Sequence, residues 1–126
     1  MSVALGRESM AVGKALGYEL EPVFGMSVEE FANATDDVLI AAMETLMSHV
    51  GKEGVTAPIH DHRKGRKSEM SYINGLVARA GEEHGISAPC NAAVTEIDRR
   101  LNEGELEMDP ANFGLLKSMV DSLPNR

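Results

Sequence analysis

The chain has 126 residues, which suits one domain with one hydrophobic core. Hydrophobic residues make up 43% of it, so the composition is globular, and the net charge of -8 argues against nucleic acid and anionic membranes as partners. No apolar run approaches the ~18 residues of a membrane span, and no secretory signal pattern opens the sequence. Cys90 is the single cysteine, so we expect no internal disulfide, a reducing and therefore cytoplasmic location, and a small buried thiol.

About five helices and no confident strand are expected, so the predicted fold class is all-α. The first helix spans about 6–16 and stops at Gly17. The second begins after Ser27, which can form a capping box with Glu30. Its apolar residues keep a helical spacing as far as Val50, and this predicts one continuous helix that packs on two neighbours.

The range 55–64 contains Pro58 and is predicted to be a loop. A third helix follows over 65–84 and stops at Gly85. Its predicted buried stripe places this helix at the centre of the domain and consists of Met70, Ile73, Val77 and Ala80. Glu69 is expected a turn inside the helix, at the edge of the stripe, where a carboxylate can face a cleft.

The last two helices are introduced by proline. Pro89 precedes a helix over about 91–101, and Asp109 with Pro110 forms an N-cap and first-turn pair. The fifth helix then runs to about Leu123, where Pro124 stops it.

Two groups in the range 60–67 have a chemical character of their own. Four cations lie within five residues, and they are either a solvated surface or a positive patch that faces an anionic substrate or a cofactor phosphate: Arg63, Lys64, Arg66 and Lys67. His60 and His62 have metal-ligand spacing, but no third ligand lies nearby in the sequence. We therefore expect loop histidines and no metal site.

Two motifs carry a resemblance to a known family. Residues 66–75 read Arg-Lys-Ser-Glu-Met-Ser-Tyr-Ile-Asn-Gly, and residues 85–91 read Gly-Ile-Ser-Ala-Pro-Cys-Asn. Together they resemble the C-terminal substrate domain of the ketopantoate reductases (2-dehydropantoate 2-reductases) of pantothenate biosynthesis. The resemblance is strongest over 61–91. It implies a helical domain of the kind found in ketopantoate and 6-phosphogluconate dehydrogenase-like reductases.

The resemblance also implies site residues. Glu69 matches the family glutamate of the active-site cleft and is the catalytic candidate. Asp61 matches an aspartate of the loop before the signature and is a substrate-binding candidate, although the residue pattern alone favours a loop-closing hydrogen bond to backbone N–H groups. The family serine that holds the substrate corresponds to Ala57, so we expect the neighbouring Thr56 to supply the hydroxyl. Because of this departure, the substrate is predicted only as a small 2-keto acid.

The sequence contains no Gly-x-Gly-x-x-Gly phosphate loop between a strand and a helix. The resemblance therefore implies that NADP is bound mainly by an N-terminal Rossmann-type domain, which also carries the catalytic lysine and is absent from residues 1–126. On this interpretation the chain is a single helical domain that is not active alone and that forms homo-oligomers. The alternative is a stand-alone helical interaction or dimerisation module that keeps the signature only for packing.

Overall fold

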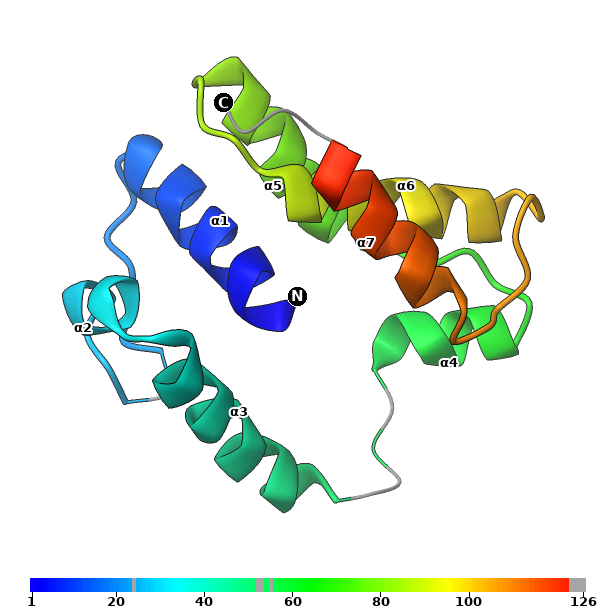
Figure 1. Cartoon of the computed structure of the whole chain (residues 1–126). Coiled ribbons are helices and arrows are strands. Elements are labelled where there is room, and N and C mark those ends of the chain that lie inside the picture. The colour runs from blue at the N-terminus through cyan, green and yellow to red at the C-terminus, as the bar shows by residue number, and fades with distance from the viewer. Residues whose placement is uncertain (24, 52–53, 55, 123–126) are drawn as a thin grey trace.

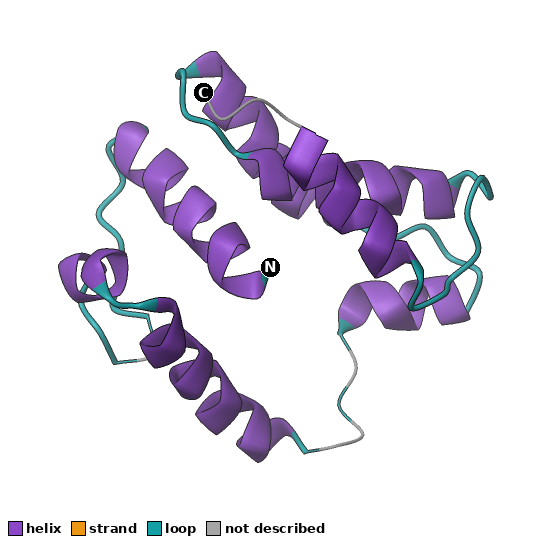
Figure 2. Cartoon of the chain, viewed as in Figure 1, coloured by secondary structure: helices purple, strands orange, loops and turns teal. Residues whose placement is uncertain are grey.

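The computed structural model describes residues 1–23, 25–51, 54 and 56–122. Within these residues the chain is helical, and β-structure is limited to an isolated bridge between Val23 and Met26, which confirms the all-α class (Figure 2). The described helices are α1 (Ser2–Ala15), α2 (Val28–Asn33), α3 (Asp36–Val50), α4 (Ala57–Arg63), α5 (Met70–Glu83), α6 (Pro89–Asn102) and α7 (Asn112–Ser122). None of these helices is long and apolar enough to cross a membrane.

Helix α1 lies between two groups of helices (Figure 1). On one side, α2 and α3 enclose a core of Val3, Phe31 and Leu39, against which partly buried side chains pack. On the other side, α5 and α6 share the largest helix interface of the domain, and α7 packs against α6. Both groups contact α1, so this helix joins the two parts of the interior.

The predicted second helix is divided into α2 and α3. The capping box between Ser27 and Glu30 is present as predicted, but Ala34 and Thr35 adopt extended backbone angles. Thr35 is the N-cap of α3, and the two acidic residues that follow it favour a new helix start. Arg7 of α1 donates hydrogen bonds to the carbonyls of Ala32 and Ala34, at 2.9 and 2.6 Å, and so satisfies the end of α2.

The apolar residues that predicted a single long helix buried between two neighbours divide, in α3, between core and surface. Leu39 is buried, whereas the larger part of the predicted stripe is half-buried or exposed: Val38, Ala42, Met43, Leu46 and Met47. The side chain of Val50 lies outside the described residues.

The predicted loop over 55–64 contains helix α4, so this prediction was wrong for its described residues; Val55 lies outside them. Pro58 occupies the first turn of α4, where a missing N–H costs no intrahelical hydrogen bond. Helix α5 begins at Met70 and not at Gly65, because Gly65 has a left-handed backbone, with φ of 68°.

The face that α5 buries is rotated from the predicted stripe. Ile73 is 59% exposed, so its predicted central position was wrong, and Ala80 is the one member of that stripe that is fully buried. The buried face is made of small residues instead. A Cβ on Gly75 would lie 3.2 Å from Thr95 Cγ2 of α6, and one on Gly81 would lie 2.6 Å from the carbonyl oxygen of Ile86. Close packing of Thr95 and of the turn after α5 onto these glycines therefore replaces the interlocking of large side chains that the stripe predicted.

The start of α6 is fixed by a carboxylate from α1. Glu8 accepts hydrogen bonds from the backbone N–H groups of Cys90 and Asn91, at 2.8 and 2.9 Å, and from the Asn91 amide at 2.7 Å. Asn91 is 0% exposed and also accepts a bond of 2.8 Å from Asn74 of α5. One acidic side chain thus satisfies the first N–H groups of α6 and complements its dipole.

The remaining boundaries differ from the prediction by up to four residues. Helix α1 begins at Ser2 and not at about Gly6, and α7 begins at Asn112, after the predicted N-cap and first-turn pair of Asp109 and Pro110. Helix α6 extends over Pro89–Asn102, and Asp109 Oδ1 accepts a hydrogen bond of 2.6 Å from the N–H of Ala111 ahead of α7. The predicted end of the fifth helix at Leu123 and Pro124 lies outside the described residues.

We predict that Gly81→Ala lowers the free energy of unfolding by ~1–3 kcal/mol, because its methyl group would meet the Ile86 carbonyl, which is backbone and cannot rotate away. Gly114 of α7 is the matched control, since nothing lies within 4 Å of a Cβ built there. Gly114→Ala should stabilise the domain by ~0.5–1 kcal/mol through the higher helix propensity of alanine. Urea denaturation followed by circular dichroism measures both, and equal effects of the two changes would contradict the close contact.

We also predict that Cys90 is unreactive in the folded domain, because burial and the nearby Glu8 carboxylate raise its pKa to about 11. Since the folded pKa lies above the ordinary value of 9.0, its contribution to stability is complete below pH 9 and is lost as the pH rises through 11. At pH 8 the reaction with a disulfide reagent should be at least ~100-fold slower than in urea. Equal rates in the folded and unfolded chain would contradict this.

Candidate functional site

The turn between α4 and α5 gathers most of the residues singled out in the sequence. The N–H groups of Lys64 and Arg66 donate to the carbonyl of Asp61, at 3.1 and 2.9 Å, and Gly65 N–H donates to the carbonyl of His62 at 3.0 Å. The left-handed Gly65 allows the chain to reverse there. The turn is therefore a hydrogen-bonded structure with a defined shape.

Asp61 closes this turn with its side chain as well. Its Oδ1 accepts a hydrogen bond of 2.8 Å from Arg66 Nη2, and the arginine side of the pair is well exposed. The pair contributes ~0–1 kcal/mol, the usual range for a solvated ion pair. The carboxylate thus closes the turn through the Arg66 side chain and not through the expected backbone N–H groups, and Asp61 Oδ2 has no hydrogen bond among the described residues.

The N–H and the hydroxyl of Ser68 both donate hydrogen bonds to side chains near the end of α6. Its N–H donates to Asn102 Oδ1 at 2.9 Å, and its hydroxyl donates to Asp98 Oδ1 in a short hydrogen bond. His62 Nε2 lies 2.8 Å from the same Asp98 oxygen, and Asn102 Nδ2 donates to Asp98 Oδ2 at 2.9 Å. The Asp98 side chain is 7% exposed, so a buried carboxylate connects α4, α6 and the residue before Glu69.

Glu69 occupies the N-cap position of α5 and is exposed. The prediction that it lies a turn inside a helix was therefore wrong, although the helix dipole still favours its charge. Its side chain makes no capping hydrogen bond, and no other described residue is its partner. The Glu69 carboxylate is free at the surface, whereas Ser68, the residue before it, is held by hydrogen bonds to α6.

Thr56 lies at the other end of α4, at its N-cap position. It is exposed, and its hydroxyl makes no capping hydrogen bond. Ala57 is the first residue of the helix. In the described part of the chain no hydrogen bond or ion pair joins Thr56, Asp61 and Glu69 to one another. The structure thus places the three candidates along one segment, 56–69, without bringing their side chains together.

The two histidines of α4 have different environments. Both lie on α4, so the prediction of loop histidines was wrong for the two of them; His60 is exposed, whereas His62 is largely buried beside Asp98. Within the described residues no three histidine, cysteine, aspartate or glutamate side chains could hold a metal ion together. Of the four cations, Arg66 pairs with Asp61, while Arg63, Lys64 and Lys67 are exposed and form no ion pair with any described residue.

Sequence reasoning missed the polar residues that hold this turn. Asp98 and Asn102 are four residues apart on α6, and Asn91 lies seven residues before Asp98, so the three follow a helical spacing on the inward side. This polar stripe between apolar residues was the available signal. Beside this stripe, Gly75 of α5 leaves room for Thr95, and Asn74 donates a hydrogen bond of 2.8 Å to Asn91.

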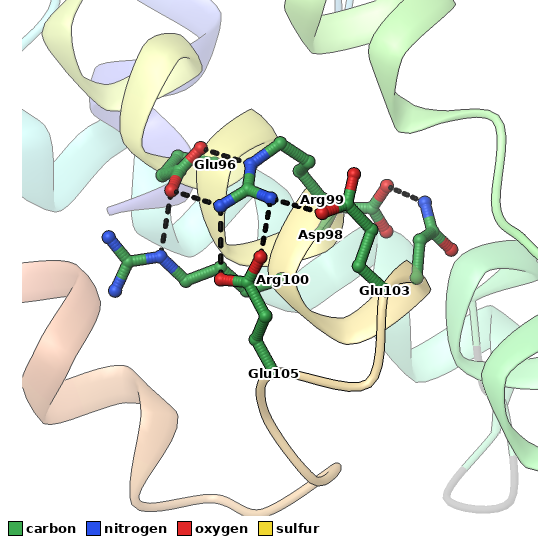
Figure 3. Close-up of polar contacts among 7 residues, drawn as sticks. Glu96, Asp98, Arg99, Arg100, Glu103 and Glu105 are labelled. Atoms are coloured by element: carbon green, nitrogen blue, oxygen red, sulfur yellow. Dashed lines mark hydrogen bonds and ion pairs between the residues drawn. The ribbon is translucent and has the colours of Figure 1, made fainter.

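A second polar cluster covers the outer side of α6 (Figure 3). Arg99 lies among three carboxylates, with contacts of 2.8 Å to Glu96, 2.5 Å to Glu103 and 2.8 Å to Glu105. Arg100 adds a contact of 2.7 Å to Glu96. Every charge in this cluster is paired with another member, so it stabilises the end of α6 and offers no free group for chemistry.

Comparison with known protein families gives a match over most of the chain. The model of the family described as "Ketopantoate reductase PanE/ApbA C terminal" matches residues 1–102, which include α1 to α6 and the turn described above. Searches of curated proteins and of solved structures gave no significant match.

We predict that Glu96 titrates far below an ordinary glutamate. Hydrogen bonds from Arg99 and Arg100 lower its pKa to about 2, so this contribution to stability is present above pH 4.5 and is lost as the pH falls towards 2. Arg99→Met should move the midpoint towards 4.5, with little loss of stability because the pair is solvated. Carboxyl NMR titration measures the midpoint, and a wild-type value near 4.5 would contradict the cluster.

Proposed function

Because the chain belongs to the ketopantoate reductase C-terminal domain family, we propose that it forms the substrate side of the active-site cleft in an NADPH-dependent 2-keto acid reductase. Glu69 is the proposed catalytic residue. Ketopantoate is the first substrate to test, and Ala57, at the place of the family serine, is the reason to test other 2-keto acids beside it.

The observation that carries this proposal is the state of Glu69. A glutamate at a helix start ordinarily caps the helix or pairs with a neighbouring cation, and Glu69 does neither among the described residues. Three unpaired cations of the adjoining turn and α4 lie near it in sequence, yet they leave it free: Arg63, Lys64 and Lys67. A carboxylate that serves no contact within its own domain is available to a group supplied from outside, such as a catalytic lysine.

The substrate is an anion, and the α4–α5 turn has the charge to attract one. Arg63, Lys64 and Lys67 give a local positive surface on a chain whose net charge is -8. Asp61 orients the Arg66 guanidinium at the same turn. If the carboxylate of a 2-keto acid bonds to this guanidinium, Asp61 contributes to substrate binding by holding Arg66 in place. Thr56, with its uncommitted hydroxyl, is the proposed second polar contact.

The described residues do not fit the main dinucleotide site. They form no β-strand that a glycine-rich phosphate loop could follow into a helix, which is the arrangement that binds the pyrophosphate of NADP. We therefore propose that a Rossmann-type domain N-terminal to this one in the complete enzyme binds NADP, and that residues 1–126 alone are inactive. A cytoplasmic homo-oligomer acting in pantothenate biosynthesis is part of the same proposal.

The alternative function, a stand-alone interaction or dimerisation module, has one observation in its favour. Tyr72, Ile73 and Leu76 form an exposed apolar strip on α5, next to Glu69. Such a strip is typical of a surface that another protein or domain covers. A contact with a nucleotide-binding domain explains both the strip and the free Glu69, whereas an interaction module explains the strip alone, so we prefer the reductase.

We predict that Glu69→Ala lowers kcat/KM by ~10²–10⁴ in the enzyme that contains this domain, the scale of an acid–base partner. Glu69→Gln should recover little activity if the charge is what matters. Stability should change by less than ~0.5 kcal/mol for either change, because the side chain is exposed and unpaired. NADPH consumption with ketopantoate measures the effect.

Glu83→Ala, an exposed change at the far end of α5, is the matched control and should leave kcat/KM unchanged. Full activity of Glu69→Ala would sink the catalytic role and leave Glu69 as a helix-terminus charge. Absence of any reductase activity with a panel of 2-keto acids would favour the interaction module.

A further inference from the structure

The carboxylate of Asp98 accepts hydrogen bonds from side chains of three chain segments. His62 comes from α4, Ser68 from the residue pair ahead of α5, and Asn102 from α6 itself. Both carboxylate oxygens are in use, and no buried side-chain polar atom in the described residues lacks a partner. The set Asp98, His62, Ser68 and Asn102 is called the Asp98 latch below.

A carboxylate is a costly choice at this position. Asp98 lies in the last turns of α6, where the helix dipole opposes a negative charge, and it is buried at the helix interface. An apolar side chain of similar size would avoid the cost of removing a charge from water. Three hydrogen bonds offset that cost, and they do so by fixing the segment that enters α5.

The latch is not a nucleophilic triad, although it contains serine, histidine and aspartate. In a triad the histidine lies between the other two and accepts the serine proton. Here Ser68 and His62 both bond to the same Asp98 oxygen, and neither bonds to the other. Ser68 donates its proton to a carboxylate and is 8% exposed, so it is a holding group and not a nucleophile.

We infer that His62, Asp98 and Asn102 are positioning residues for Glu69, because they hold Ser68, the residue before it, at both its N–H and its hydroxyl. This inference rests on the proposed function of Glu69. Adjacent Cα atoms are a fixed ~3.8 Å apart, so fixing Ser68 confines the Glu69 backbone while its side chain stays free. Arg66 and Asp61 brace the other end of the same turn, so the catalytic candidate projects from a segment held on both sides.

Amide hydrogen exchange on the 126-residue chain tests the holding contact. The Ser68 N–H donates to Asn102 Oδ1, so Asn102→Ala and His62→Phe should speed its exchange at least ~10-fold relative to Ala93, a buried residue of α6 that reports global opening. His62→Gln keeps a nitrogen donor and should restore most of the protection. His60→Phe, an exposed change on the same helix, should have no effect. Unchanged Ser68 exchange in both Asn102→Ala and His62→Phe would overturn the inference.

Activity of the complete enzyme tests the consequence for Glu69. A small misplacement of a reacting group costs up to ~10²-fold, so His62→Phe and Asn102→Ala should lower kcat by ~10–10²-fold with little change in KM, and His62→Gln should recover most of it. Gly81→Ala is the matched control, since it destabilises the domain away from the latch and should keep kcat when the enzyme is folded. The positioning role would be overturned if the latch variants lose activity only in proportion to the fraction of enzyme that is unfolded, which is the behaviour expected of Gly81→Ala. If Glu69→Ala impairs the enzyme while the latch variants do not, this inference fails and the proposed function stands; if Glu69→Ala has no effect, the proposed function fails.

Discussion

The hydrogen bonds from the start of α6 to Glu8 of α1 are the contact on which the arrangement of this domain depends. The bonds join residues 82 and 83 positions apart in sequence, and they connect the central helix α1 to the larger helix pair, α5 and α6. Asn91 extends the contact, because it also bonds to Asn74 of α5 and to the carbonyl of Leu5. Loss of this carboxylate would leave the first N–H groups of α6 buried without partners. The free-energy cost of such unpaired groups exceeds the net contribution of the individual hydrogen bonds to stability.

Helix α6 carries the polar side chains that fix this arrangement, and they have separate tasks. Asn91 sets where α6 meets α1, Asp98 and Asn102 set where the α4–α5 turn meets α6, and Arg99 stabilises the end of the helix. Buried polar contacts of this kind accept few alternative partners, so they favour one helix arrangement over others of similar burial. The small residues Gly75 and Gly81 then allow α5 to approach closely.

Local rules predicted the local features of the fold. The capping box at Ser27, the helix start at Pro89 and the burial of Cys90 depend on neighbouring residues, and each was predicted from sequence. The rotation of α5 was not, because its contact face consists of glycine and alanine, which a count of large apolar residues overlooks. Helix α4 was missed because Pro58 was interpreted as a loop residue and not as a first-turn residue.

The sequence indicated which segment carries the candidate site residues, but not which distant residues hold that segment in place. The signature indicated the segment that contains Asp61 and Glu69, whereas the residues that shape it, Asp98 and Asn102, lie 30 and 34 positions from Ser68. Contacts at such separations depend on the tertiary fold, and no local spacing in a single sequence specifies them.

The division of the interior by α1 has a thermodynamic consequence. Helix α3 is tied to the rest of the domain chiefly through Leu39 and the partly buried Met43, whereas α5 and α6 are joined along their length. Segments with few buried contacts open at a lower free energy than the whole domain does. We therefore expect the helices around α3 to open at a lower free energy than those around α6, so that partial unfolding releases the first group while the second, with Glu69 and its turn, keeps its native form.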